Sequence, residues 1–229
     1  MDNKLRYRHE LKFEITYFDY LNMRNRLKAV MQSDPHTVNG KYLIRSIYFD
    51  NYRDKALLEK INGYARREKF RIRYYNDDFS FISLEKKMKI NDLCLKASAP
   101  ISEEECRKLL DGDREWMLEN ASELVKEFYT KLNTQLLRPQ VLVSYTREPY
   151  IFKVGNVRVT FDMDIRSTLF KKEFLQKEVS DINVGEKTGD MILEVKFDDY
   201  LPDVIADIIQ LGSCEQIAFS KYGACRRFG

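Results

Sequence analysis

The stretch EKFRIRYYN, residues 68–76, alternates between two kinds of side chain with a period of two. Successive side chains of a strand point to opposite faces of a sheet, so one face of this stretch would carry only cations. That row, extended upstream by one residue, comprises Arg67, Lys69, Arg71 and Arg73, whereas the apolar row comprises Phe70, Ile72 and Tyr74. An ordinary half-exposed strand turns its apolar face inward. The direction in which the four cations point therefore decides the fold.

Four further stretches show the same separation of charged and apolar residues. Their aligned polar residues are Arg8, Glu10 and Lys12; Glu85, Lys87 and Lys89; Arg158, Thr160, Asp162, Asp164 and Arg166; and Glu194 and Lys196. Two architectures satisfy the pattern: an open sheet whose charged face meets water, and a barrel with charges inside and apolar residues outside, beneath helices. Charges inside a barrel require opposite charges, a metal or an ionic ligand. Clustered Arg and Lys with fewer carboxylates suit a ligand with several phosphates and a divalent cation.

The composition indicates a globular chain of one large domain or two small ones. The 229 residues are 44% hydrophobic and 33% charged, which supplies a core and more charge than an average domain carries. Lys and Arg total 39 against 36 Asp and Glu, so the formal net charge is only +3. This near balance disfavours general nucleic-acid binding, and we expect no nucleic-acid partner.

Cysteine and histidine usage argues against a zinc site and against a disulfide framework. The four cysteines form no C-x-x-C pair, and only two histidines are present. The N-terminal residues have no apolar signal core, and no run of 18 apolar residues occurs. We therefore expect a soluble, reduced, cytoplasmic protein, which leaves room for docking on a separate membrane protein.

The order of strand-like and helix-like segments predicts an α+β fold with a mainly antiparallel sheet. Roughly eight runs are rich in alternating, β-branched or aromatic residues. Helical spacing of apolar residues predicts helices over residues 16–31, 102–112, 113–133 and 201–212. Ser102 and Glu105 have the spacing of a capping box, and Pro202 and Gly212 mark the two ends of the last helix.

Eight short motifs in a fixed order carry a resemblance to a known family. They are RHELKF, SIYFDN, KFRIRYY, LEKKMKINDLCLKASAP, VSYTREPY, VRVTFDMDI, ILEVKF and FSKYGACR, spread from about Arg6 to Arg227. In this order and spacing the sequence resembles the VTC domain, the catalytic domain of the vacuolar transporter chaperone complex and its bacterial relatives. That domain belongs to the triphosphate tunnel metalloenzymes. Single motifs such as R-x-R are common by chance, but the ordered set is specific.

The resemblance implies both a fold and an activity. The expected fold is a single domain over residues 1–229, a closed tunnel of eight antiparallel strands with a charged interior and flanking helices. The expected activity is that of a polyphosphate polymerase, which transfers the γ-phosphate of ATP to a growing inorganic polyphosphate chain and depends on Mn²⁺ or Mg²⁺. Two alternatives use the same tunnel: a triphosphatase acting on inorganic or nucleoside triphosphates, and a non-catalytic module that binds polyphosphate or nucleotides.

The resemblance also assigns residue roles. It implies catalytic roles for Arg71, Arg73, Arg147, Arg158 and Lys87. It implies substrate binding by Lys12, Lys96, Tyr145 and Lys221, and metal binding by Glu194. Glu10, Glu85, Asp162 and Asp164 are weaker candidates for the metal, with neutralisation and orientation of the cations as the alternative role.

Two departures from the family pattern bear on function. Tunnel triphosphatases begin with an E-x-E-x-K strand, whereas Arg8 stands here where the first glutamate would be, before Glu10 and Lys12. This substitution favours the polymerase over the hydrolase. The long eukaryotic relatives also carry a phosphate-sensing helical domain and membrane helices, and neither is recognisable here, so regulation by inositol phosphates and direct export of product are not expected. The sequence does not indicate an oligomeric state.

Overall fold

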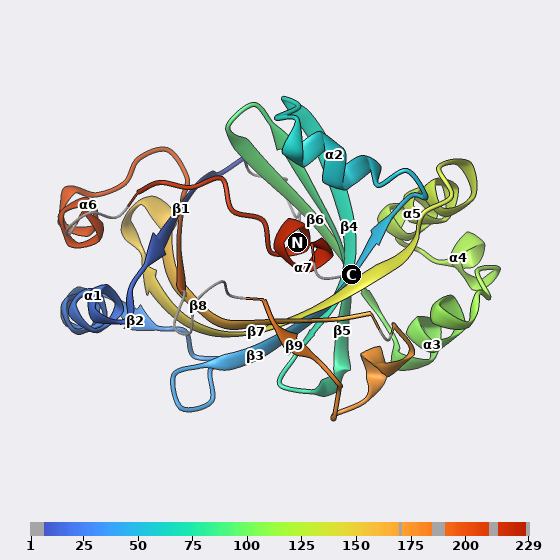
Figure 1. The fold of residues 1–229 in the computed structure, drawn as a ribbon, viewed down its shortest axis with the longest axis horizontal. Coiled ribbons are helices and arrows are strands. Elements are labelled where there is room, and N and C mark those ends of the chain that lie inside the picture. The colour runs from blue at the N-terminus through green and yellow to red at the C-terminus, as the bar shows by residue number, and fades with distance from the viewer. Residues whose placement is uncertain (1–6, 170, 185–190, 211–214, 228–229) are drawn as a thin grey trace.

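The centre of the structure is one curved sheet of ten strands, in which every pairing is antiparallel (Figure 1). The computed structural model describes residues 7–169, 171–184, 191–210 and 215–227. The strands are β1 (His9–Ile15), β2 (Gln32–Ser33), β3 (Tyr42–Asp50), β4 (Arg66–Tyr75), β5 (Asp78–Ile90), β6 (Leu93–Ile101), β7 (Arg138–Phe152), β8 (Val157–Thr168), β9 (Ile182–Asn183) and β10 (Met191–Phe197). The helices are α1 (Tyr17–Val30), α2 (Lys55–Ile61), α3 (Glu103–Asp111), α4 (Trp116–Glu119), α5 (Glu123–Thr134), α6 (Asp203–Ile209) and α7 (Lys221–Arg226), with two 3₁₀ turns, η1 (Val154–Asn156) and η2 (Lys171–Leu175).

Eight strands form the main path of the sheet, in the order β1-β10-β8-β7-β3-β4-β5-β6. The two-residue strands β2 and β9 lie off this path, on β7 and β8. The edge strands β1 and β6 share no ladder. They approach at one isolated bridge, where the backbones of Arg8 and Cys94 exchange hydrogen bonds of 3.0 and 2.9 Å. The expected tunnel-like sheet of eight main strands is thus confirmed, but a continuous ladder does not close it.

The stretch that opened the sequence lies in β4, and its apolar face points outward beneath helices. Phe70, Ile72 and Tyr74 are buried in a cluster with side chains of α3, α4 and α5. The rings of Phe70 and Phe128 stack with centroids 5.0 Å apart. Because these helices occupy the convex side, the cations of β4 face the inside of the curve. The inverted orientation expected of a charged interior is confirmed.

A second outer core covers the opposite end of the sheet. Helices α1 and α6 lie beside each other over β1, β10 and β8 (Figure 1). Met23 and Leu27 of α1 are fully buried there, packed in one cluster with Phe161 of β8 and Leu193 of β10. Both outer cores therefore hold the sheet in its curved form from the convex side.

The interior is charged over only part of its length. Helix α7 lies within the curve of the sheet (Figure 1), where Tyr222 and Cys225 pack in one buried cluster with Ile44, Val141 and Val143. β3 and β7 are apolar on both faces in this region, as is typical of strands buried on both sides. The prediction of a charged interior therefore holds for one part of it, which charged side chains line, whereas α7 fills the other part.

The expected alternation of β8 breaks at Asp164. Asp164 has a left-handed backbone (φ 52°), and the register of β7 with β8 shifts at this level. The extra residue reverses the facing of the residues after it, as in a β-bulge. Ile165 joins the interior cluster, whereas Arg166 pairs with Asp181 at 2.7 Å. The prediction that Asp164 and Arg166 share the charged face with Asp162 is thus wrong.

Helix boundaries follow local hydrogen bonding. The capping box of Ser102 and Glu105 is present at the start of α3. The single helix expected over 113–133 is instead two, α4 and α5, because Asn120 is extended (ψ 139°) and its side chain accepts a hydrogen bond from the backbone N–H of Ser122. Pro202 precedes α6 as expected, and Gly212 lies outside the described residues. Across the described ranges, no helix is both long and apolar enough to cross a lipid bilayer.

Candidate functional site

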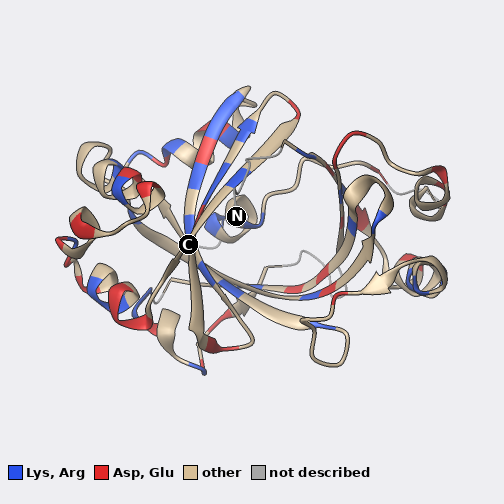
Figure 2. Ribbon diagram, turned by 180° about the vertical axis from the view of Figure 1, so that it is seen from behind, with Lys and Arg blue, Asp and Glu red and all other residues tan. Residues whose placement is uncertain are grey.

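A cavity of about 340 Å³ opens on the concave side of the sheet, within the size range of ligand sites. It is bounded by β1, β4, β5, β10 and the segment Gln216–Tyr222. Among the described residues that line it, eleven are Lys or Arg and only two are Glu. The cations are Lys12, Lys60, Arg67, Lys69, Arg71, Arg73, Lys87, Lys89, Arg147, Lys196 and Lys221, and the glutamates are Glu10 and Glu194. Such an excess inside a protein is stabilised by an anionic ligand. Figure 2 shows Lys and Arg following the strands of the curved sheet.

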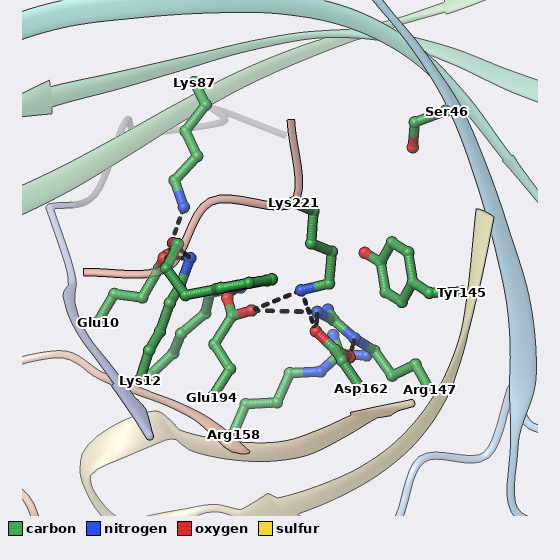
Figure 3. Close-up of polar contacts among 12 residues, drawn as sticks. Glu10, Lys12, Ser46, Lys87, Tyr145, Arg147, Arg158, Asp162, Glu194 and Lys221 are labelled. Carbon is green, nitrogen blue, oxygen red and sulfur yellow. Dashed lines mark hydrogen bonds and ion pairs between the residues drawn. The ribbon is translucent and has the colours of Figure 1, made fainter. Parts of the chain in front are cut away.

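An ion-pair network joins β7, β8, β10 and α7 at the inner end of the cavity (Figure 3). Arg147 holds Asp162 through two nitrogens, at 2.5 and 2.6 Å, and reaches Glu194 Oε2 at 3.2 Å. The ammonium of Lys221 lies 2.5 Å from Asp162 Oδ2 and 4.6 Å from the centroid of the Tyr145 ring. The register of β10 with β8 places Glu194 opposite Thr160, two residues from Asp162, which brings the two carboxylates to adjacent levels of the same interior face.

The carboxylates of this network are held ionised. Burial raises the pKa of Glu194, but Lys196, Lys12 and Arg147 outweigh it, and the pKa lies well below its usual range. Burial likewise raises the pKa of Asp162, and Arg147 with Lys221 brings it below the ordinary value. A carboxylate with a lowered pKa is a weak base, so neither group is suited to removing a proton from water at neutral pH.

Two further carboxylates, Glu10 and Glu85, neutralise cations at the walls. Glu10 lies 3.0 Å from Lys12 and 2.5 Å from Lys87 (Figure 3). Burial raises its pKa, and Lys12 and Lys87 lower it to a value far below normal. Glu85 accepts hydrogen bonds from Arg71 Nε at 2.7 Å and from Lys96 Nζ at 2.5 Å. These contacts fix the direction of the cationic side chains before any ligand binds.

The arginine pair of β4 is held in place by hydroxyl groups. Arg71 donates to the Tyr48 hydroxyl at 3.0 Å. Arg73 donates to Ser46 Oγ at 3.0 Å and to the Tyr145 hydroxyl at 3.1 Å. Each guanidinium keeps further N–H groups for a ligand, since Arg carries five donors in a fixed fork.

The structure brings eight of the ten predicted site residues to this cavity: Lys12, Arg71, Arg73, Lys87, Tyr145, Arg147, Glu194 and Lys221. Lys96 is not among the lining residues; its side chain is 50% exposed and lies 2.5 Å from Glu85. Arg158 lines a second cavity of about 360 Å³ with Tyr42 and Asp34, whose Oδ2 it approaches at 2.8 Å.

Several lining residues were not assigned from the sequence. Four of them lie on the same strand faces as assigned residues: Arg67, Lys69, Lys89 and Lys196. The alternation of charged and apolar residues along the strands could therefore have identified them. Tyr48 of β3 also faces the cavity, beside Arg71. Lys60 lies on helix α2, and nothing in the strand pattern points to it.

The resemblance carried by the motifs implies a divalent cation, and the residues of the inner network fit one in part. Among the described residues, no group of three or more His, Cys, Asp and Glu side chains is placed to hold a metal. Glu194 and Asp162 nevertheless supply hard oxygen donors, and the buried Thr160 hydroxyl next to them finds no hydrogen-bond partner in the described part of the chain. Mg²⁺ and similar ions are commonly bound by one or two carboxylates together with substrate phosphates. The donor set fits this arrangement rather than a cage made only of protein atoms.

Comparison with solved structures shows the same fold at low sequence identity. HpAC1 from Hippeastrum, a proposed adenylyl cyclase with a dominant triphosphatase activity, has 11% identity and a TM-score of 0.57, over 97% of this chain and 95% of its own. The PH1819 protein of Pyrococcus horikoshii has 15% identity and a TM-score of 0.51, over 97% and 100%. A protein from Bacillus halodurans proposed to be an adenylate cyclase has 13% identity and a TM-score of 0.51, over 84% and 81%.

Sequence comparison identifies the family. No curated protein matches the chain significantly. Residues 7–228, in contrast, match the VTC domain, a span that includes every strand of the sheet and the whole cationic cavity. The ordered motifs and this match agree, and the chain therefore belongs to the VTC domain family.

Proposed function

We propose that the chain is a polyphosphate polymerase, which transfers the γ-phosphate of ATP to a growing inorganic polyphosphate chain. The observation that carries the proposal is the excess of eleven cations over two glutamates among the described residues around one cavity in a VTC domain. Both the substrate and the product are polyanions with repeating phosphates, and Arg and Lys are the side chains that bind such groups.

The arginines that the site holds in fixed positions are assigned to the triphosphate of ATP. Arg71 and Arg73 reach it from β4, and Arg147 reaches it from β7. Arg158, beside the second cavity, contacts the nucleotide from the other side of the inner network. Tyr145 and Lys221 complete the inner wall. Lys12, Lys87 and Lys96 guide the acceptor chain.

The reaction requires alignment and charge neutralisation more than covalent participation of the protein. A terminal oxygen of the acceptor chain forms a bond to the γ-phosphorus, and the bond from that phosphorus to the β,γ-bridging oxygen breaks. ADP leaves with the bonding electrons. A phosphate oxyanion is already a nucleophile, so no general base is needed. This fits a cavity whose carboxylates, Glu10 and Glu194, are ion-paired and have lowered pKa values.

Glu194, with Asp162 beside it, would hold the divalent cation. When bound, that cation neutralises charge on the phosphate oxygens. The chain's own contribution is to keep both carboxylates ionised and oriented through Arg147 and Lys221.

One assay tests the proposal against its two alternatives. The protein is incubated with ATP and Mn²⁺, in parallel with Mg²⁺, and the products are separated by chain length while free phosphate is measured. Long phosphate chains are expected. Release of free phosphate without chains would show a triphosphatase, the activity described for the HpAC1 protein that shares the fold. Binding of ATP without turnover would show an inert binding module, and either result would overturn the polymerase.

A further inference from the structure

The cation row of β4 changes its surroundings between its inner and its outer half. In the ladder with β5, Arg71 stands opposite Glu85, so that this level of the wall is charge-balanced. At the next two levels outward, Lys69 stands opposite Lys87 and Arg67 stands opposite Lys89. Like charges directly across a ladder destabilise it. Two successive levels of this kind mark a part of the wall that is built for an external anion.

Glu10 pairs with Lys87 at the first of these levels, at 2.5 Å, but the described residues supply almost no carboxylate to the other cations of the outer half. In the part of the chain that the structure describes, Lys69 contacts no carboxylate and instead donates to Ser220 Oγ at 3.1 Å. Arg67 donates to the backbone carbonyl of Tyr64. Lys89 has, within the described ranges, only Asp92, at 3.8 Å and with a side chain that is 98% exposed. An ion pair so exposed and so long contributes little.

The groups that face Lys69 come from every neighbouring element and are cationic or neutral. Lys87 faces it from β5, Lys12 from β1, Arg67 and Arg71 from β4, and Ser220 and Tyr222 from the segment around the start of α7. Burial together with these four cations lowers the pKa of Lys69 to about 7. Lys60 of α2 shows the same tendency, since burial and then Arg67 lower its pKa.

We propose that Lys60, Arg67, Lys69 and Lys89 form a second anion subsite, separate from the triphosphate site, which binds a segment of a linear phosphate chain and takes up a proton on Lys69 as it does so. The ligand's identity rests on the proposed function. Side chains two residues apart on one strand face are separated by about 6.6 Å. Arg67 and Lys69 are spaced in this way, so a chain of linked phosphates contacts both of them better than a single phosphate does. Bound anion replaces the missing carboxylate and favours the charged form of Lys69.

Binding of defined ligands to the whole protein tests the subsite without relying on turnover. Isothermal titration calorimetry compares long-chain inorganic polyphosphate with tripolyphosphate, in the absence of ATP, for wild type, Lys69→Gln and Arg67→Gln. Lys126→Gln on the outer face of α5 removes the same charge far from the cavity and is the matched control. We expect the two cavity variants to weaken polyphosphate binding about 10-fold each and to leave tripolyphosphate affinity nearly unchanged. An equal loss for both ligands, or a loss as large in Lys126→Gln, would overturn a separate subsite.

Lys69→Arg tests the proton separately and also covers the case in which Lys69→Gln does not fold. Arg keeps its charge at all working pH values. At pH 8, the heat of polyphosphate binding to wild type should depend on the ionisation enthalpy of the buffer, because a proton is taken up. In Lys69→Arg we expect tight binding with a smaller proton uptake. Unchanged uptake in this variant would overturn the role of Lys69. Polyphosphate binding with these properties would support the subsite even if the product assay found no polymerase.

Discussion

Arg73 is a single residue whose removal should separate function from folding. Its guanidinium is fixed by Ser46 and Tyr145 and lines the cavity rather than an outer core. Losing one preorganised charge contact to a transferring group typically costs about 3 kcal/mol, or roughly 10²-fold in rate. We expect Arg73→Ala to lose ATP turnover on that scale while its thermal unfolding stays cooperative.

Arg107→Ala, which removes an exposed arginine from α3, is the control and should turn over ATP as wild type does. Unchanged ATP turnover in Arg73→Ala would show that Arg73 does not bind the triphosphate.

Glu85 should make stability depend on acid. It is buried, which raises its pKa, but Arg71, Arg73 and Lys96 lower the pKa far below the ordinary value. A group with a depressed folded pKa contributes stability that is present above its unfolded pKa, about 4.3, and that is lost as pH falls toward the folded pKa. We expect the free energy of unfolding of wild type to decrease as the pH is lowered below about 4.

Urea unfolding of Glu85→Gln at several pH values checks this linkage. At pH 7 the variant should be less stable by about 3 kcal/mol, because its buried cations lose their partner. Its acid dependence should be shallower than that of wild type. Parallel acid profiles for the two proteins would contradict the assignment.

For single residues, the sequence predicted which side chains face the interior better than it predicted which ion pairs they form. The period of two placed Arg71, Arg73, Lys87 and Glu194 on one surface, because side-chain facing in a regular strand is a local property. Which carboxylate pairs with which cation depends on register between distant strands, and no local pattern shows that Glu10 meets Lys87. That Lys69 meets no carboxylate within the described ranges was hidden for the same reason.

Among the elements, β3 is tied to two helices through Asp50. Its carboxylate accepts hydrogen bonds from the backbone N–H groups of Ala56 and Leu57 in the first turn of α2, and from the Tyr222 hydroxyl of α7 at 2.7 Å. Asp50 therefore fixes the end of this strand to the helix that follows it and to α7.

Asp50→Ala should therefore destabilise the protein by about 3 kcal/mol, because it leaves several buried donors without an acceptor. Tyr222→Phe removes only one of these hydrogen bonds and should cost about 1 kcal/mol. Urea unfolding measures both free energies. Equal costs for the two variants would show that Asp50 acts on α7 alone.

Regular elements were predictable and their interruptions were not. The capping box of α3 is a local hydrogen-bond pattern that the sequence displays directly. The bulge at Asp164 and the break at Asn120 depend on backbone conformations that several residue types adopt. The burial of α7 inside the curve follows from the two-sided apolar character of β3 and β7, and no property of the six residues of α7 alone predicts it.

The molecule as a whole should be stabilised by polyanions. The eleven cations found among the described residues around the cavity repel one another. A ligand that binds only the folded state stabilises it by about 2.7 kcal/mol at 100 times its dissociation constant. We expect tripolyphosphate to raise the midpoint of thermal unfolding. Sodium chloride at matched ionic strength is the control, because it screens charge without binding the site. Equal effects of the two salts would mean that the cavity does not bind phosphate chains.

The overall architecture was predictable because the family resemblance decided between two readings of the strand pattern. The five strands with separated faces allowed an open sheet or a barrel, and the eight ordered motifs favoured the tunnel. How the sheet ends was not predictable. Closure depends on the summed twist and curvature of eight strands. Among the described residues, the two edges of the sheet meet at the isolated bridge between Arg8 and Cys94.

The pairing of β1 with β10 also has a consequence for biosynthesis. β1 is the first of these strands to leave the ribosome, yet its ladder partner is the last strand of the sheet. Contacts so distant in sequence form late and slowly. Until β10 has been translated, the strand that carries Glu10 and Lys12 has no ladder partner, and Glu194 has not been synthesised. The cationic cavity therefore forms only after β10 has been synthesised, and an unfinished chain that stops before β10 cannot assemble it.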